Sequence, residues 1–204
     1  MKGRIGLFGG SFDPVHRGHL DPILDARRRL GLERVIFLPT ARPPHKPKRR
    51  FAPALMRYAM VELALLDEPD LWVSDHELLG EGPTYTVDTV AHFADRWPGA
   101  ELVLLIGSDS FAELPTWRRW RELIERIRLA VLVRPGWEPE ALRGELPAEL
   151  RRLMDRQRID FVADRPRPIS STDLRDRLAT GDELPDGWIP EQVLRFIEKY
   201  KLYR

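Results

Sequence analysis

The sequence predicts an α/β protein built on a doubly wound parallel sheet. Short apolar runs alternate with amphipathic stretches of helical period along the 204 residues. Several of these runs are apolar at nearly every position, as expected for strands that are covered on both faces. Segments rich in glycine, proline and hydroxyl side chains follow the runs. We therefore expect a single Rossmann-like domain over residues 1–204, with helices on both faces of the sheet.

The predicted elements follow one another in a regular order. Strands are expected at 4–8, 34–38, 71–75, 101–107, 129–133 and 159–162. Helices are expected at about 18–30, 53–66, 86–97, 116–127, 139–157, 172–179 and 190–199. Pro22 lies inside the first helical stretch. That helix either begins at Pro22 behind an Asp21 cap, or begins near Arg17 and bends at the proline.

Composition excludes several classes of function. The chain carries 33 basic and 32 acidic residues and has no global positive field that would attract nucleic acid. It has no cysteine, which excludes disulfides, thiolate metal sites and cysteine nucleophiles. No leader pattern precedes the first strand, and no apolar run approaches the roughly 20 residues of a membrane span. We expect a cytoplasmic protein that binds neither nucleic acid nor membrane; the sequence does not indicate its oligomeric state.

The loop after the first strand, "GGSFDPVHRGH" (9–19), is the most informative segment. Gly9 and Gly10 allow a ligand to approach the backbone closely, although neither the Walker nor the dinucleotide glycine pattern is present. His16 and His19 are three residues apart and would share one face of a helical turn. A metal pair, a phosphate-binding pair and two surface histidines all fit this spacing. Ring N–H groups beside two glycines at a helix N-terminus favour a phosphate, and no third metal ligand of suitable spacing is evident.

Other polar segments follow later strands, where ligands bind in open α/β sheets. "PPHK" offers Lys46 as a point charge for phosphate, or as part of a solvated basic loop. "RPISSTDLR" offers Ser170, Ser171 or Thr172 as the cap of a helix. Arg175 would lie one turn into that helix and face the same anion, unless this is an ordinary capped helix.

Three further motifs suit the rest of a nucleotide. Asp109 in "GSDS" fits ribose hydroxyls or a metal bound through water, or is a helix cap. "PTYTVDT" places Thr84 or Thr86 where a helix begins. Trp117 and Trp120 in "LPTWRRW" either pack in the core, or one of them stacks on a flat ring.

Together, "GGSFDPVHRGH" and "ISSTDLR" resemble the HxGH nucleotidyltransferases. With "PPHK", "YTVDT", "IGSD", "LPTW" and "VRPG" in the same order, the chain is similar to the bacterial nicotinate-nucleotide adenylyltransferase family. The resemblance implies transfer of AMP from ATP to nicotinate mononucleotide, giving deamido-NAD and pyrophosphate in NAD biosynthesis, with Mg²⁺. The alternatives are a sister adenylyltransferase for nicotinamide mononucleotide or phosphopantetheine, and a nucleotide-binding regulator without catalysis.

The resemblance also implies roles for individual residues. The catalytic groups would be His16, His19, Lys46 and Arg175, and no residue is assigned as a ligand of Mg²⁺. The ATP site would comprise Gly9, Gly10, Ser11, Phe12, His16, His19, Gly107, Asp109, Arg134, Ile169, Ser170, Ser171, Thr172 and Arg175. The mononucleotide site would comprise Ser11, His45, Lys46, Thr84, Tyr85, Thr86, Trp117 and Arg118. Helices from about residue 170 would complete the phosphate site. Relatives often carry threonine at position 11 and an aromatic residue at 118, so the resemblance assigns no role to the Arg118 side chain.

Overall fold

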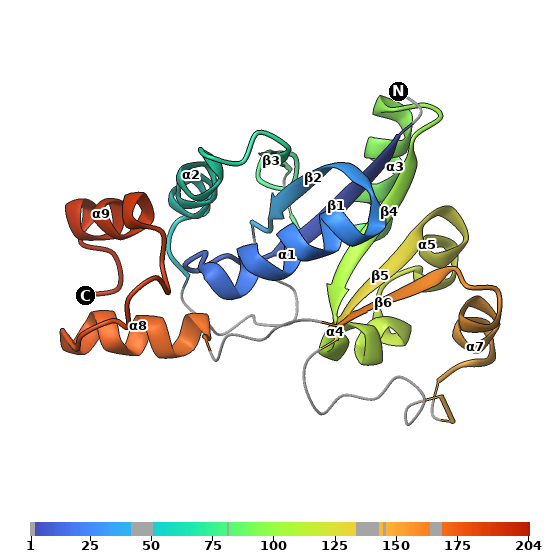
Figure 1. Cartoon of the computed structure of the whole chain (residues 1–204). Helices are drawn as coiled ribbons and strands as arrows, with labels where there is room; N and C mark the ends of the chain where they lie inside the picture. Colours follow the sequence, from blue (N-terminus) through green and yellow to red (C-terminus); the bar gives the residue numbers. More distant parts are fainter. Residues whose placement is uncertain (1–2, 42–50, 81, 134–142, 145, 164–168) are drawn as a thin grey trace. The chain divides into compact units, whose positions relative to one another are not determined.

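The computed structural model describes residues 3–41, 51–80, 82–133, 143–144, 146–163 and 169–204. These residues form two compact units. Figure 1 colours the chain along its sequence, from blue at the N-terminus to red at the C-terminus. One unit contains residues 1–8, 25–35 and 85–166. The other contains residues 9–24, 36–84 and 167–204. The expectation of a single domain whose last helices complete the phosphate site stays a prediction.

The strands of the described chain form one six-stranded sheet with the order β3-β2-β1-β4-β5-β6. They are β1 (Arg4–Gly10), β2 (Leu32–Pro39), β3 (Leu71–Val73), β4 (Glu101–Gly107), β5 (Arg128–Val133) and β6 (Ile159–Ala163). The pairs β1–β4, β4–β5 and β5–β6 are parallel, with Leu7 opposite Leu104 and Leu105 opposite Ala130. The order runs outward from β1 in both directions, which is the doubly wound arrangement. The predicted fold class is confirmed.

The described helices follow the predicted order with local differences. They are α1 (Arg17–Leu30), α2 (Ala54–Leu65), α3 (Thr86–Arg96), α4 (Ser108–Glu113), η1 (Leu114–Thr116), α5 (Trp120–Arg126), α7 (Ala148–Asp155), α8 (Ser171–Thr180) and α9 (Glu191–Tyr200). Helix α1 begins at Arg17 and contains Pro22, so the second of the two predicted starts is correct. None of these described helices is long and apolar enough to cross a membrane.

Two predicted helices were too long. The stretch 116–127 becomes helical only at Trp120, because Trp117 is extended and Arg119 adopts a left-handed φ of 53°. Within the described part of 139–157, the helix covers Ala148–Asp155 and is preceded by Pro147. Helix α4 was not predicted, since six residues are too few to display a helical period.

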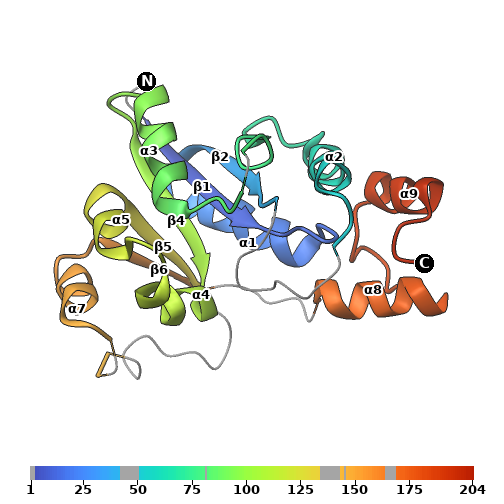
Figure 2. The same ribbon diagram turned by 180° about the vertical axis from the view of Figure 1, so that it is seen from behind.

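The first unit has a predominantly apolar centre. Leu104, Leu129, Ala130 and Val131 on β4 and β5 are at most 3% exposed, as the continuous apolar runs predicted. Helix α4 packs on β4 and β5, and α3 packs on α5. In Figures 1 and 2, α5 and α7 lie beside the part of the sheet formed by β5 and β6. These strands therefore provide a rigid support for the loops that follow them.

In the second unit, α2 packs against both β3 and α9. Figure 2 shows α2 and α9 side by side. Phe12, Phe37, Met60 and Val193 are buried, with at most 1% of each residue exposed. This unit contains the whole loop from Gly9 to His19 together with α8. His16, His19 and Arg175, which were predicted to bind phosphate, therefore lie on one compact body.

Gly6 on β1 gives a test of the packing in the first unit. A Cβ atom at position 6 would lie 2.7 Å from Cδ1 of Leu105, and 3.0 Å from side-chain atoms of Leu32 and Val35. We expect Gly6→Ala to lower the free energy of unfolding by about 1–3 kcal/mol, because a packed core resists an added methyl group. Urea unfolding measures this. Gly144→Ala, at a site with nothing within 4 Å of the added atom, is the control. Equal stability of the two variants would contradict the packing described here.

Candidate nucleotide-binding site

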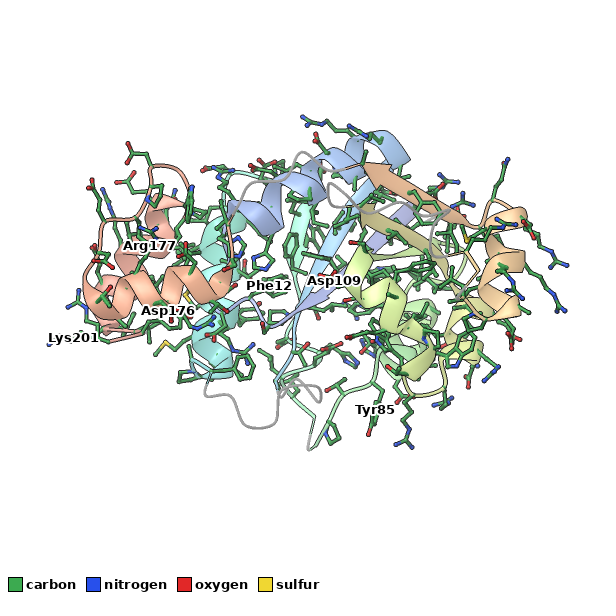
Figure 3. All side chains as sticks on the ribbon, turned by 90° about the horizontal axis from the view of Figure 1, so that it is seen from below. Phe12, Tyr85, Asp109, Asp176, Arg177 and Lys201 are labelled. Carbon is green, nitrogen blue, oxygen red and sulfur yellow. The ribbon has the colours of Figure 1, made fainter. Side chains whose placement is uncertain are left out.

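The loop after β1 begins with a sharp change of direction at Phe12. Phe12 has a left-handed φ of 46° and is 1% exposed. Its ring packs on Phe37 and meets the ring of His19 edge-on, with centroids 5.3 Å apart. In Figure 3, Phe12 is labelled directly after strand β1. A buried aromatic side chain thus anchors the loop in a conformation that few residues adopt.

The two histidines of the loop lie together. Their ring centroids are 3.8 Å apart, with His16 3% exposed and His19 half-buried. The backbone N–H of His16 donates to Nδ1 of His19 at 3.3 Å, which leaves Nε2 of a neutral His19 ring as a hydrogen-bond donor. At Gly18, a Cβ atom would lie 2.9 Å from Nδ1 of His16. The glycine between the histidines therefore makes room for the buried ring.

Burial changes what His16 can offer an anion. It lowers the pKa of His16 from 6.5 to about 4, so the ring is neutral at physiological pH. Its Nδ1 atom is buried and has no hydrogen-bond partner among the described residues. His16 can therefore give a phosphate a hydrogen bond but no positive charge.

The carboxylate of Asp13 connects this loop to distant segments. Asp13 is completely buried. Its Oδ1 accepts a hydrogen bond from the Ala52 backbone N–H at 3.1 Å and from the Tyr203 hydroxyl at 2.8 Å. Its backbone carbonyl accepts one from Nη1 of Arg175 at 2.6 Å, and the same Nη1 lies 3.9 Å from Oδ2. Burial, followed by the charge of Asp13, raises the pKa of Tyr203, so its hydroxyl stays a donor.

Arg57 on α2 fixes the backbone beside Asp13. It is 1% exposed, and its guanidinium donates to the carbonyl oxygens of Ser11 (2.6 Å), Ala52 (3.0 Å) and Ala41 (3.1 Å). Burial lowers the pKa of Arg57, while the nearby Asp13 charge opposes that change. The sequence motifs do not indicate a role for Arg57. A single arginine in the apolar stretch "ALMRYAMVELAL" is the signal that could have indicated a buried cation.

Helix α8 is bound to the loop by its first turn. Ser170, one of the three predicted caps, accepts a hydrogen bond from the Asp173 backbone N–H at 3.0 Å. Ser171 donates through its hydroxyl to the carbonyl of Pro14 at 3.2 Å. Arg175 donates through Nη2 to the Thr172 hydroxyl at 3.0 Å. Figure 3 labels Asp176 and Arg177, the next residues of the same helix. The predicted serine, threonine and arginine of this motif therefore belong to one network with Asp13.

The first unit holds four of the eight residues predicted to bind the mononucleotide: Tyr85, Thr86, Trp117 and Arg118. Helix α3 begins at Thr86, with Tyr85 at its N-cap and no side-chain cap. The guanidinium of Arg118 lies 4.5 Å from the centre of the Tyr85 ring. Trp120 is 7% exposed and packs in the core, whereas Trp117 is only half-buried. Of the two tryptophans, Trp117 is therefore the one accessible for stacking.

The remaining predicted residues have varied surroundings. Thr84, in the second unit, donates to the Glu77 carbonyl at 3.4 Å. Gly107 is the N-cap of α4, and the exposed Asp109, labelled in Figure 3, lies in its first turn. His45, Lys46 and Arg134 lie outside the described residues. Within the described part of the chain, no group of three or more histidine, aspartate or glutamate side chains could hold a metal ion.

Known proteins resemble this chain along nearly its whole length. The sequence pattern of the cytidylyltransferase-like family matches residues 7–177. A probable nicotinate-nucleotide adenylyltransferase of Aeromonas hydrophila is 38% identical over 218 residues, covering 100% of this chain and 99% of the relative. One of Neisseria meningitidis is 40% identical over 200 residues, covering 98% of each. Plasmodium falciparum nicotinic acid mononucleotide adenylyltransferase complexed with NaAD shares the fold, with a TM-score of 0.78 and 19% identity over 98% of this chain and 97% of that chain.

The lowered pKa of His16 has a consequence for stability. Between pH 6.5 and about 4 the unfolded chain binds a proton at this residue and the folded chain does not. The free energy of unfolding therefore falls as the pH is lowered through this window, and the His16 contribution at pH 5 is a loss of about 2 kcal/mol relative to pH 7.5. We expect His16→Gln to lack this contribution when urea unfolding is measured at both pH values. An unchanged pH dependence would show that His16 titrates normally.

Proposed function

We propose that this chain, which belongs to the nicotinate-nucleotide adenylyltransferase family, transfers AMP from ATP to nicotinate mononucleotide. The products are deamido-NAD and pyrophosphate, and the reaction serves NAD biosynthesis. The observation that carries the proposal is the loop of residues 9–19. Its two histidine rings lie 3.8 Å apart, and it is connected to the first turn of α8 through Asp13 and Pro14. We also propose that the enzyme is cytoplasmic.

The chemistry requires alignment more than a protein base. A phosphate oxygen of nicotinate mononucleotide attacks the α-phosphorus of ATP, and the bond from that phosphorus to the pyrophosphate oxygen breaks. The attacking oxygen is already ionised at neutral pH, so no side chain has to remove a proton. Catalysis then comes from holding the two substrates in line and stabilising charge on the transferred phosphoryl group. This agrees with a site rich in hydrogen-bond donors.

Each group of the loop and α8 has a role in binding ATP. Nε2 of His19 and the ring of His16 donate hydrogen bonds to phosphate oxygens. The backbone of Gly9, Gly10, Ser11 and Phe12 lies along the nucleotide. Ser170, Ser171 and Thr172 bring the N-terminus of α8 to the phosphates, beside Ile169. Arg175 supplies the positive charge that a neutral His16 lacks, and Lys46 supplies another. Gly107, Asp109 and Arg134 bind the remainder of ATP.

Mg²⁺ accompanies ATP in this proposal. The described residues hold no group of carboxylates or histidines that fits a resident metal. The ion is therefore proposed to be bound by the phosphate oxygens of the substrate, where it neutralises part of their charge. No protein ligand is assigned to it.

The proposed pyridine site selects by hydrogen-bond polarity. Nicotinate carries a carboxylate where nicotinamide carries a neutral amide of similar shape. Backbone N–H groups at the start of α3, near Thr84, Tyr85 and Thr86, are donors that favour the carboxylate. The backbone near Arg118 adds a donor, and Trp117 stacks on the ring. His45 and Ser11 complete the set proposed for the mononucleotide.

His19 tests the catalytic role of the loop. We expect His19→Ala to lower kcat by about 100-fold or more with the fold intact, because a positioned donor to the transferred phosphate is lost. Pyrophosphate release from ATP and nicotinate mononucleotide gives the rate, and circular dichroism checks folding. His92→Ala on α3 is the matched control and should keep the wild-type rate. A folded His19→Ala protein with near-normal turnover would remove His19 from the mechanism.

The choice of pyridine tests the substrate. We expect kcat/KM for nicotinate mononucleotide to exceed that for nicotinamide mononucleotide by about 100-fold or more, because the amide would leave about two donors unpaired at roughly 1–3 kcal/mol each. Trp117→Ala should weaken both substrates, since stacking does not depend on the charge. The assay compares the two mononucleotides at saturating ATP. Preference for the amide would indicate a sister adenylyltransferase, and no pyrophosphate with either would indicate a regulator without catalysis.

A further inference from the structure

The last residues of the sequence contact the loop of residues 9–19. After α9 ends at Tyr200, Lys201 and Tyr203 adopt left-handed φ values of 52° and 66°. The Leu202 backbone N–H donates to the Ile197 carbonyl at 3.0 Å and closes the helix. Figures 1 and 2 show the chain ending beside α8 and α9. Two non-glycine residues in a sparsely populated conformation, two positions apart, indicate that the surrounding contacts dictate this path.

The contact that this path makes is the hydrogen bond from the Tyr203 hydroxyl to Oδ1 of Asp13. It is 2.8 Å long and joins residues 190 positions apart. Asp13 is completely buried, so each donor to its carboxylate replaces a hydrogen bond that water would otherwise make. The Ala52 backbone N–H also donates to Oδ1, at 3.1 Å. The tyrosine therefore contributes directly to the stabilisation of this charge.

Arg175 is the group that would respond to the loss of this donor. Its Nη1 lies 3.9 Å from Oδ2 of Asp13, beyond hydrogen-bond distance, while it donates to the Asp13 carbonyl at 2.6 Å. Its Nη2 donates to Thr172 at 3.0 Å. A buried carboxylate with fewer donors attracts the nearest cation more strongly. Without the tyrosine hydroxyl, Arg175 would move toward the carboxylate and away from Thr172 and the start of α8.

We propose that Tyr203 is a positioning residue for adenylyl transfer: by binding Asp13, it keeps the guanidinium of Arg175 at the N-terminus of α8 for the phosphates of ATP. The proposal rests on the function proposed above. It gives the segment after α9 a role in catalysis that none of the sequence motifs indicates. Tyr203 touches neither substrate in this proposal and acts through Asp13 and Arg175.

Tyr203→Phe removes the hydroxyl and keeps the ring. We expect KM for ATP to rise about tenfold, which corresponds to about 1.4 kcal/mol, while KM for nicotinate mononucleotide changes less than twofold. Tyr200→Phe is the matched control, since Tyr200 is the last residue of α9, three positions before Tyr203, with 46% of its surface exposed. It should leave both KM values unchanged. In an Arg175→Lys background, Tyr203→Phe should add little to the rise in KM for ATP.

Other results would overturn the proposal. A lowered melting temperature with an unchanged KM for ATP, an equal rise in both KM values, or a Tyr203→Phe protein that cannot fold would each show a purely structural role. If the wild-type protein releases no pyrophosphate, the proposed function fails by itself. Calorimetric binding of a non-hydrolysable ATP analogue to the wild type and to Tyr203→Phe then tests the positioning separately, and equal affinities would reject it.

Discussion

The buried carboxylate of Asp13 is the constraint on which the candidate site depends. Removing a carboxylate from water costs several kcal/mol unless donors replace its hydration. Asp13 obtains these donors from Ala52, before α2, and from Tyr203, after α9, while its carbonyl accepts from Arg175 on α8. Three segments far apart in the sequence therefore meet at one residue of the loop. All three contribute to holding the shape of the loop.

This arrangement suits a reaction that needs positioned donors. Arg57 fixes the carbonyls of Ser11, Ala41 and Ala52, and Ser171 fixes that of Pro14, so the backbone around Asp13 is held on both sides. His16 is neutral because it is buried, and His19 is oriented by the backbone N–H of its neighbour. Donors held in place before the substrate arrives need no reorganisation during the reaction. Such a site agrees with a nucleophile that is already ionised.

The sequence predicted the sheet well because its strands are local patterns. The runs at 102–106 in β4 and 129–132 in β5 are apolar at every position, and the structure buries all of these residues. The short α4 and the late start of α5 at Trp120 were missed, since a six-residue helix and a left-handed Arg119 leave no periodic signal. Ser170 was among the predicted caps because capping depends on neighbouring residues. The enzyme family followed from the motifs and is confirmed by the relatives.

The network behind the motifs could not be predicted in the same way. Arg57 and Ser11 are 46 residues apart, and Tyr203 and Asp13 are 190 apart, so no local spacing relates them. Their association arises only when the sheet and the helices have packed. The same holds for the lowered pKa of His16, which is a consequence of burial and not of its neighbours in the sequence. Sequence patterns thus indicated which loops bind ligands, whereas the structure indicates what holds them.

The role of the buried Asp13 carboxylate is tested most directly by the affinity of the Asp13→Asn variant for a non-hydrolysable ATP analogue, determined by isothermal titration calorimetry. The substitution keeps the shape of the side chain and removes the charge that gathers the surrounding donors. We expect Asp13→Asn to bind the analogue at least about tenfold more weakly than the wild type does, which is equivalent to about 1.4 kcal/mol. Asp176→Asn, at an exposed position of α8, should bind normally. A folded Asp13→Asn protein that binds the analogue as tightly as the wild type would contradict the central role of the buried carboxylate.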